Sequence, residues 1–365
     1  MPLGNDGVSC TIRFADGRSV GLEMIYSVSH VRGFRLGSSY CVIETLNPSL
    51  VSMNEFAIHS RFTIQYERKN KTTPPIDMEV FRIDNGVAMG NVCARIIAVE
   101  PGYIKMVEDT KIRSFQNQEI SSVIRSIATD AGLKPKVQTT SGKATYIQPN
   151  TNDFQFVKEY LQPLAVDGNG HGPYLFTIDN GNFYFQLPIL NQTPLANLVL
   201  SSHIDTIIKK WTVRNQGAQT DLAVGNKLRS YGYDHAQKGT IVLNQNIQGA
   251  SSKALSKNTY SSTFVRTNHT PHDKQWMIQA HAANDQGRAQ FTIEVDAIIE
   301  GSVDYSPGHL IQFSLVNESS LTLQEYSGTY YIYEILNSIK QNHFTAHMFL
   351  KSNATLKNIV AGKNI

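Results

Sequence analysis

The chain has 365 residues, of which 17% are charged and 41% are hydrophobic, and its formal net charge is +3. This length suits two or three domains with buried cores. The basic excess is small and dispersed, with no basic run longer than pairs such as Arg68-Lys69 and Lys209-Lys210. Composition therefore argues against direct DNA binding.

The three cysteines, Cys10, Cys41 and Cys93, are an odd number and lack CxxC spacing. We expect free, buried or partly buried thiols in a reducing compartment, and no zinc site. The N-terminus lacks a basic segment followed by an apolar run. No stretch approaches the ~18 apolar residues of a membrane span. The sequence predicts a soluble chain made in the cytoplasm, without a membrane anchor.

The first ~112 residues have the pattern of β-strands separated by turns. An opening hairpin is predicted over residues 11–14 and 19–24, with its turn at Asp16-Gly17. Residues Arg61–Arg68 alternate apolar and polar side chains, which predicts a strand with one buried face. Further antiparallel strands, divided by a turn at Asp84-Asn85-Gly86, are predicted over residues 78–83 and 91–99.

Residues 115–186 differ from the strands around them, because they combine two short amphipathic helices with a hairpin. The first helix is predicted over about 117–131, with Asn117 as N-cap and Gly132 as its C-terminal stop. The second starts near Asn152, has Gln155 in capping-box spacing, and is limited by Pro163. A hairpin over residues 174–186 turns at Asp179-Asn180-Gly181. These elements predict a small α/β layer.

Strands resume after this layer, at about residues 206–213. Residues from about 215 to 273 are rich in Ser, Asn, Gln, Gly and Thr, which predicts a long polar excursion that a partner could order. A helix is predicted over about 274–286 and a half-buried strand over 291–297. The C-terminal ~60 residues predict an antiparallel meander with a turn at Lys340-Gln341-Asn342. Two β units of comparable size thus flank the α/β insert, and every strand signal is antiparallel and local.

Candidate sites for chemistry are weak throughout the chain. The loop from Asp167 to Gly172 opens like a calcium loop, but position five is His171 and position twelve is Ile178 instead of glutamate. A flexible loop is the better interpretation. The closest histidine pairs are His269 with His272 and His343 with His347. The latter pair would lie ~13 Å apart along one strand face, too far to share a metal.

No GxSxG, Walker or GxGxxG motif occurs, and nothing selects a carboxylate pair for glycoside hydrolysis. We therefore name no catalytic, cofactor-binding or metal-binding residue and expect no cofactor. The sequence predicts that the protein is not an enzyme.

The ordered elements resemble the hub proteins of phage tail baseplates and related contractile injection systems, including the hub portion of type VI secretion spike proteins. Three stretches carry the resemblance: Phe115-Gln116-Asn117 leading to residues 120–133, then residues 153–161, and the closing strands 328–339 and 344–350. The polar excursion at 215–273 departs most from a compact member of that family.

The resemblance implies a mainly β (α+β) fold in which two barrel-like antiparallel tube domains enclose the α/β insert. The expected domains are residues 1–112, 113–198 and 199–365. Such hubs are ring-forming homotrimers with pseudo-sixfold symmetry, which join a sixfold tail tube to a threefold central spike. The resemblance also implies that genomic DNA passes through the lumen without specific binding.

The implied partners are a second and third copy of the chain, the tail tube protein, the central spike protein and other baseplate proteins. The location is the virion, after assembly in the host cytoplasm, and because the sequence ends at Ile365 without a β-helical needle, the spike is expected to be a separate protein. Two alternatives stay open. One is a glycan- or receptor-binding β protein of the virion periphery, and the other is a cell-wall hydrolase that uses unselected carboxylates.

Overall fold

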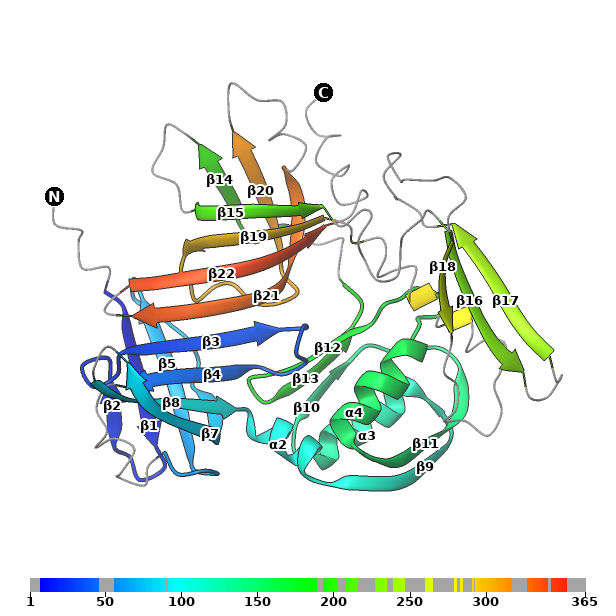
Figure 1. Ribbon diagram of the computed structural model, residues 1–365, viewed down its shortest axis with the longest axis horizontal. Helices are drawn as coiled ribbons and strands as arrows, with labels where there is room; N and C mark the ends of the chain where they lie inside the picture. The colour runs from blue at the N-terminus through cyan, green and yellow to red at the C-terminus, as the bar shows by residue number, and fades with distance from the viewer. Residues whose placement is uncertain are drawn as a thin grey trace.

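The computed structural model describes residues 7–45, 56–88, 91–188, 193–201, 208–215, 227–234, 239–246, 260–264, 279–280, 283–284, 291, 293–316, 327–340 and 343–352. Within these residues the chain is mainly β, with large antiparallel sheets, as expected. Figure 1 shows a broad curved sheet on one side and a small helix-containing layer beside it.

The first β unit packs its strands around an aromatic and aliphatic core. Apolar side chains alternate with polar ones along each strand, so that Phe62, Ile64 and Tyr66 of β5 point inward. The opening hairpin is confirmed, with Gly17 at φ +88° in its turn. The strands are β1 Ser9–Phe14, β2 Ser19–Gly21, β3 Ser27–Gly33, β4 Tyr40–Thr45, β5 Arg61–Arg68, β6 Lys71–Thr72, β7 Ile76–Ala88 and β8 Asn91–Val99.

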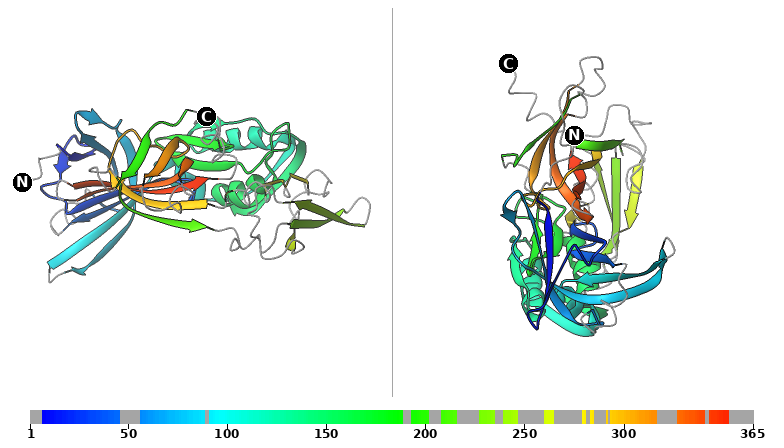
Figure 2. Two further views of the ribbon diagram at one scale, coloured as in Figure 1. Left: turned by 90° about the horizontal axis from the view of Figure 1, so that it is seen from above. Right: turned by 90° about the vertical axis from the view of Figure 1, so that its left-hand side faces the viewer.

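The turn predicted at Asp84-Asn85-Gly86 is wrong. These residues continue β7, where Asp84 pairs with Arg95 and Gly86 pairs with Cys93. The hairpin closes later, at the pair Ala88 and Asn91. Asp, Asn and Gly are typical turn residues, but here the backbone hydrogen bonds to β8 hold them in an extended arm. Figure 2 shows this hairpin extending away from the rest of the unit.

The α/β unit follows and has a separate core in which helix α3 and three strands pack through aromatic rings. The unpredicted helix α2 adds Met106 to this core. Its elements are α2 Pro101–Glu108, β9 Thr110–Glu119, α3 Ile120–Asp130, β10 Lys134–Val137, β11 Lys143–Asn152, α4 Asp153–Gln155, the π-helix Phe156–Leu161, the 3-10 helix Gln162–Leu164, β12 Leu175–Asp179 and β13 Asn182–Gln186.

The two predicted helices are present, with different starts and types. Asn117 is not an N-cap: it lies in β9 at φ +50°, because β9 pairs with β11 up to Glu119 and the helix begins only at Ile120. Asn152 does cap the second helix, since its side chain accepts a hydrogen bond from the backbone N–H of Gln155 at 2.8 Å. That helix continues in π and 3-10 geometry.

The Asn-Gly hairpin is confirmed. Strands β12 and β13 pair antiparallel around Asn180 and Gly181, both at positive φ, as a tight type I′ turn requires. The expectation that every pairing is antiparallel is wrong, because β10 pairs with β13 in parallel and β14 pairs with β20 in parallel. The alternation of apolar and polar side chains indicates a half-buried strand, but it does not indicate whether the neighbouring strand runs parallel or antiparallel to it.

The second β unit begins after residue 193 and builds a third core around Phe313, Tyr330 and Met348. The strands predicted at 206–213, 291–297 and in the C-terminal meander are all present. They are β14 Asn197–Ser201, β15 Ile208–Asn215, β19 Ile293–Glu300, β20 Leu310–Val316, β21 Gly328–Lys340 and β22 His343–Ser352.

Much of the predicted excursion at 215–273 and of the predicted helix at 274–286 lies outside the described residues. Three described segments of the excursion form a separate small sheet, β16 Lys227–Asp234, β17 Gly239–Asn246 and β18 Tyr260–Phe264. Residues 279–280 and 283–284 are helical, and Asn284 donates a hydrogen bond to the carbonyl of Ala165 at 2.8 Å. The domain boundaries at 112 and 198 stay a prediction.

One continuous sheet joins the two β units. Its central path runs β15-β19-β22-β21-β3-β4-β8-β7, so four strands of the second unit meet four of the first. The meeting point is the antiparallel pair β21 and β3, which lie side by side in Figure 1.

The two β units repeat the same arrangement of strands. In chain order, β3, β4, β5, β7 and β8 of the first unit correspond to β15, β19, β20, β21 and β22 of the second, because each set makes the same neighbour pairings in its sheet. The α/β unit lies between the two repeats, and the polar excursion enters the second repeat where the first has the short β3–β4 connection.

The hairpins β7–β8 and β21–β22 match residue by residue. Each first strand has 13 residues, with a β-bulge at its sixth position, Phe81 in one and Tyr333 in the other. Each hairpin closes across two residues, at Ala88 with Asn91 and at Lys340 with His343. The buried residues Ala94, Ile96 and Ala98 thereby correspond to Ala346, Met348 and Leu350.

Candidate functional site: the seam between the two β units

The seam is the antiparallel ladder between β3 and β21, which unites the two repeats. It runs from the pair Ser27 and Lys340 to the pair Gly33 and Glu334. Near its middle, the side-chain oxygens of Ser29 and Ser338 lie 3.4 Å apart, so the two strands are in full register. Continuous backbone pairing fixes the orientation of one unit relative to the other.

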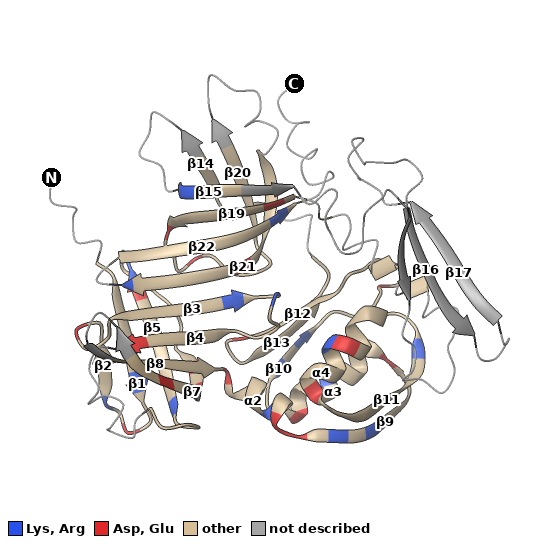
Figure 3. Cartoon of the chain, viewed as in Figure 1, with Lys and Arg blue, Asp and Glu red and all other residues tan. Residues whose placement is uncertain are grey.

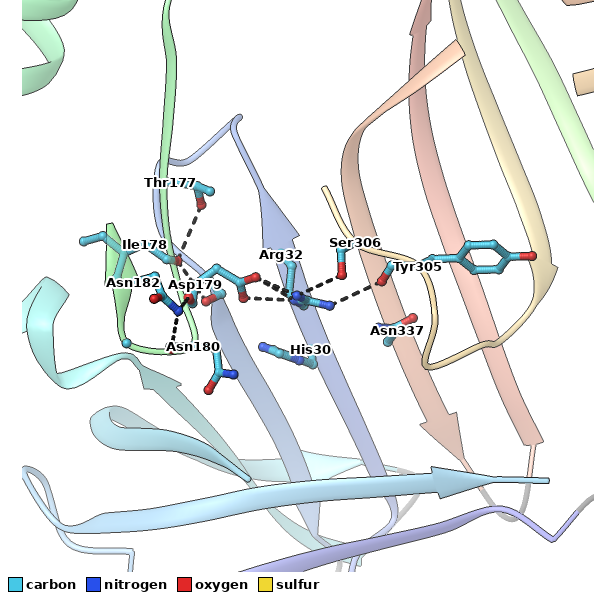
Figure 4. A network of polar contacts seen from close by, with 12 residues as sticks. His30, Arg32, Thr177, Ile178, Asp179, Asn180, Asn182, Tyr305, Ser306 and Asn337 are labelled. Carbon is cyan, nitrogen blue, oxygen red and sulfur yellow. Dashed lines mark hydrogen bonds and ion pairs between the residues drawn. The ribbon is translucent and has the colours of Figure 1, made fainter. Parts of the chain in front are cut away.

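On the core side of the seam, Arg32 of β3 makes the central contact. Its Nε and Nη2 donate to the carboxylate of Asp179, at the end of β12, at 2.9 and 2.6 Å. Its Nη1 donates to the carbonyl of Tyr305 at 3.3 Å, and Nη2 also reaches Ser306 Oγ at 3.3 Å. Figure 4 shows the guanidinium between the α/β hairpin on one side and this second-unit loop on the other. One side chain thus ties together all three units.

Two further polar side chains line the seam beside Arg32. Asn337 of β21 donates from Nδ2 to the hydroxyl of Tyr66 at 3.1 Å, and His30 of β3 has its Nδ1 3.5 Å from the same hydroxyl. Both side chains are buried where the apolar cores of the two β units meet. A buried polar group needs a specific partner, so this network favours one relative position of the units.

Glu100 anchors the hairpin turn from the other side. It is buried just before α2, and its carboxylate accepts hydrogen bonds from the backbone N–H of Asn180 and, at 2.7 Å, from that of Gly181. Ser39 Oγ donates to it as well, while Ser39 N donates to the carbonyl of Ile178 at 2.8 Å. We call Arg32, Asp179, His30, Tyr66, Asn337, Ser39 and Glu100 the polar junction.

Electrostatics of the polar junction follow from burial and from the Arg32–Asp179 pair. Burial disfavours the Asp179 charge, but the adjacent guanidinium outweighs it, so the pKa of Asp179 lies below its ordinary value. Burial, aided by the charge of Arg32, lowers the pKa of His30 to about 3. Burial raises the pKa of Glu100 to about 7, against the opposing hydrogen bond from Ser39. At neutral pH the junction therefore holds a charged pair beside a neutral histidine.

A close approach of backbone to rings positions the connection between β3 and β4. Gly37 lies at φ +81°, and a Cβ on it would come within 2.9 Å of ring atoms of Phe154 and Phe176. Only glycine permits this contact, which seats the connection on the α/β core.

The sequence-based candidates for chemistry do not converge on the polar junction. The Asp167 carboxylate instead accepts hydrogen bonds from the backbone N–H groups of Asn169 and His171, as in an ordinary Asx turn. His343 and His347 lie on β22, the former exposed and the latter 3.4 Å from Asp296; His269 and His272 lie outside the described residues. Cys10 and Cys41 are buried free thiols, and Cys93 is half-buried.

Sequence reasoning missed the polar junction, although it left a trace. In the strand Ser27–Gly33, His30 and Arg32 occupy alternate positions on what becomes the buried face. Asp179 was interpreted only as part of a turn. A charged residue on the inward face of a strand is the signal that pointed to a buried partner.

A pocket of about 310 Å³ lies at the end of the seam, between the sheet and the α/β unit. Its walls carry the rings of Phe34, Phe291 and Tyr333, with Lys158 and Lys351 at its border. A neighbouring pocket is lined by Glu294 and Asp296. Within the described residues, both carboxylates already have side-chain partners, because Lys351 lies 2.8 Å from Glu294 and His347 lies 3.4 Å from Asp296.

Comparison with known proteins gives matches at the level of structure. No family model and no curated protein sequence matches the chain significantly. Among solved structures, the tail protein from Neisseria meningitidis MC58 superposes with a TM-score of 0.67 at 9% identity, covering 96% of this chain and 98% of that one. The chain has the fold of a phage tail protein.

Two further structures support this assignment. The 43 kDa tail protein of prophage MuSo2 from Shewanella oneidensis gives a TM-score of 0.64 at 12% identity, with 94% and 98% of the chains covered. An E. coli component of the type VI secretion system, described as similar to the phage T4 tail proteins gp27 and gp5, gives 0.51 at 7% identity, with 95% and 80% covered. The resemblance to tail and spike-related proteins is thus confirmed for the fold. Within the described residues, no helix is long and apolar enough to cross a membrane.

Proposed function

We propose that the protein is a structural hub of a phage tail baseplate, a ring of three copies that joins the sixfold tail tube to a threefold central spike. The carrying observation is the repeat within the chain: two β units with the same strand order, joined side by side in one sheet. Three copies would present six similar units around one axis. A ring of this kind adapts a sixfold partner to a threefold one.

In this proposal the sheet face opposite the three cores lines the lumen through which genomic DNA passes. The register places charged residues of both signs on this face of β7, β8, β4, β21 and β22. Figure 3 shows blue and red positions interspersed over these strands. Mixed charge would not retain the phosphate backbone, whereas a basic wall would. The residues are Arg82, Asp84, Arg95, Glu44, Lys340, Glu334 and Lys351.

The α/β unit would brace the ring from outside the sheet, because the polar junction fixes it to both β units. The role is assembly and conduction, without catalysis, in the virion and with other baseplate proteins as neighbours.

The test is the mass and symmetry of the purified protein. Light scattering should give three times the 40.7-kDa chain, and electron micrographs of end views should show a ring with an open centre. Mixing with the tail tube protein should place the ring on tube ends. A monomer at high concentration, with no affinity for tube ends, would overturn the proposal.

The aromatic pocket at the end of the seam is the observation that favours a second candidate function, binding of a glycan or receptor at the virion periphery. Replacing Tyr333 by alanine would abolish glycan binding on an array if this function holds. If the ring forms normally and the protein binds no glycan, the hub function stands and the second candidate function is wrong.

A further inference from the structure

Within the described residues, two long strands of the main sheet, one in each repeat, pair on one side only over much of their length. Strand β5 pairs with β7 only from Ile76 to Glu79, so beyond Val80 the described part of β7 pairs on one side only, with β8. At the other end, β19 is the only described strand that pairs with β15 from Lys210 to Asn215. Open edges expose unpaired backbone donors and acceptors, and proteins usually cover them or pair them with another chain.

The seam inside the chain shows how these edges fit each other. β21, which pairs with β3, is the counterpart of β7, and β3 is the counterpart of β15. The counterpart strands run in equivalent directions. Each step from β7 through β8 and β4 to β3 in the first repeat is antiparallel, and so is each step from β21 through β22 and β19 to β15 in the second repeat. Strand β7 of one copy would therefore meet β15 of the next in the antiparallel sense of the internal seam.

The correspondence also fixes the register. Ser338 of β21 occupies the position of Gly86 in β7, two residues before the hairpin closes. Ser29 of β3 occupies the position of Thr212 in β15, because the ladder through Val42 and Ile97 matches the ladder through Asp296 and Phe349. Since Ser29 stands opposite Ser338 in the internal seam, Thr212 and Gly86 are predicted to stand opposite each other.

We propose that copies of this chain join by β-strand addition, with β7 of one copy antiparallel to β15 of the next and Gly86 opposite Thr212. The partner surface is thus a second copy, and the contact repeats the internal seam between molecules. This inference rests on the proposed ring, and it adds which edges meet and in which register.

Exposure along the two edges agrees with this pairing. In the internal seam the bulge residue Tyr333 packs beside Phe34, with ring centroids 6.2 Å apart. Its counterpart Phe81 is 48% exposed in the single chain, an unusual state for a large aromatic residue. Gly86 and Thr212 are exposed as well. In the seam geometry Phe81 would lie at the interface with the neighbouring copy, close to the end of β15.

Disulfide cross-linking tests the register directly. The internal pair Ser29 and Ser338 has side-chain oxygens 3.4 Å apart, a separation that paired cysteines convert to a disulfide with little movement. The experiment uses Gly86→Cys with Thr212→Cys, in a Cys93→Ser background, because Cys93 faces Gly86 within its own hairpin. Gly86 has no positive φ, and a Cβ added there would meet only Cys93 Sγ, at an ordinary contact distance of 4.0 Å, so the substitution should be tolerated.

Oxidation should give covalently linked multimers on a non-reducing gel, with at least a tenfold excess over either single-cysteine variant. The register control is Gly86→Cys with Lys210→Cys, which moves one cysteine ~7 Å along the strand and should link poorly. The geometry control is Ser29→Cys with Ser338→Cys, which should close within one chain.

The outcomes separate this inference from the proposed function. If the protein forms a ring of three copies and the internal control closes, but Gly86→Cys with Thr212→Cys does not link, the proposed seam between copies is wrong. The proposed hub function would still stand. Stronger linking of the shifted pair overturns the register. A protein that stays monomeric overturns both.

Discussion

Replacing Asp179 by asparagine should destabilise the protein by about 3–5 kcal/mol, because it leaves the Arg32 guanidinium buried without its counter-charge. The neutral amide keeps the shape of the carboxylate, so the loss reports the charge and the two short hydrogen bonds. In a cooperative unit of 150–250 residues, about 2–4 °C of melting temperature corresponds to each kcal/mol, which predicts a drop of about 6–20 °C.

The assay is urea unfolding followed by fluorescence, combined with hydrogen exchange of the hairpin amides at Asn180 and Gly181. These amides should lose protection first, since Asp179 holds the turn against the sheet. The double variant Arg32→Met with Asp179→Leu should recover most of the stability, because an apolar pair removes both buried charges. Asp304→Asn is the matched control: its partner Lys71 is exposed, and the loss should stay below about 1 kcal/mol. A loss for Asp179→Asn as small as the control would refute the account of the junction.

Two further predictions concern the pH dependence and the hairpin turn. The pKa of Glu100 in the folded protein, about 7, exceeds the ordinary 4.5, so its contribution to the free energy of unfolding is present at low pH and is lost as pH rises through 7. The pKa of His30 in the folded protein, about 3, lies below the ordinary 6.5, so its contribution is lost as pH falls below 6.5. Between pH 7 and 5 the two effects are about 2 kcal/mol each and opposite in sign. In urea titrations the Glu100→Gln variant should therefore lose stability on acidification, and the His30→Gln variant should gain stability. Identical pH profiles for the two variants would contradict this. Gly181→Val, at φ +70°, should cost about 1–3 kcal/mol in thermal melts, whereas Gly168→Val, in open space, should cost little; equal losses would count against a strained turn.

The sequence predicted several of the strands that have one buried face, but it gave no range for β3, β4 or β11. In Arg61–Arg68 and His343–Ser352 the alternation of apolar and polar side chains is regular, and the burial in the structure follows it residue by residue. The capping residue Asn152 and the Asn-Gly turn were also predictable, because their geometry depends on neighbouring residues only. Local physics was sufficient for these elements.

Contacts between distant residues were not predictable. Strand β9 overrides the helical signal at Asn117 because its partner β11 lies about thirty residues further along the chain. The Asp84-Asn85-Gly86 turn signal gives way to the ladder with β8. The repeat of the two hairpins was hidden as well, since equivalent positions share burial and register more than residue identity.

The polar junction shows the same limit. Arg32 and Asp179 are 147 positions apart, and no sequence pattern near either residue identifies the other as its partner. Only the inward position of Arg32 on its strand could have suggested a buried partner.

The internal seam and its proposed copy between molecules differ in strength. Counterpart positions hold Asn215 for Arg32 and Val213 for His30, so the register offers the second seam no equivalent of the arginine at the centre of the polar junction. A ring under outward pressure would then have the same backbone hydrogen-bond ladder at six seams, three within chains and three between chains. Only the three seams within chains would also have the Arg32–Asp179 ion pair beside them. Rupture should begin between copies and leave each chain folded, which would let a baseplate open or come apart without unfolding its parts.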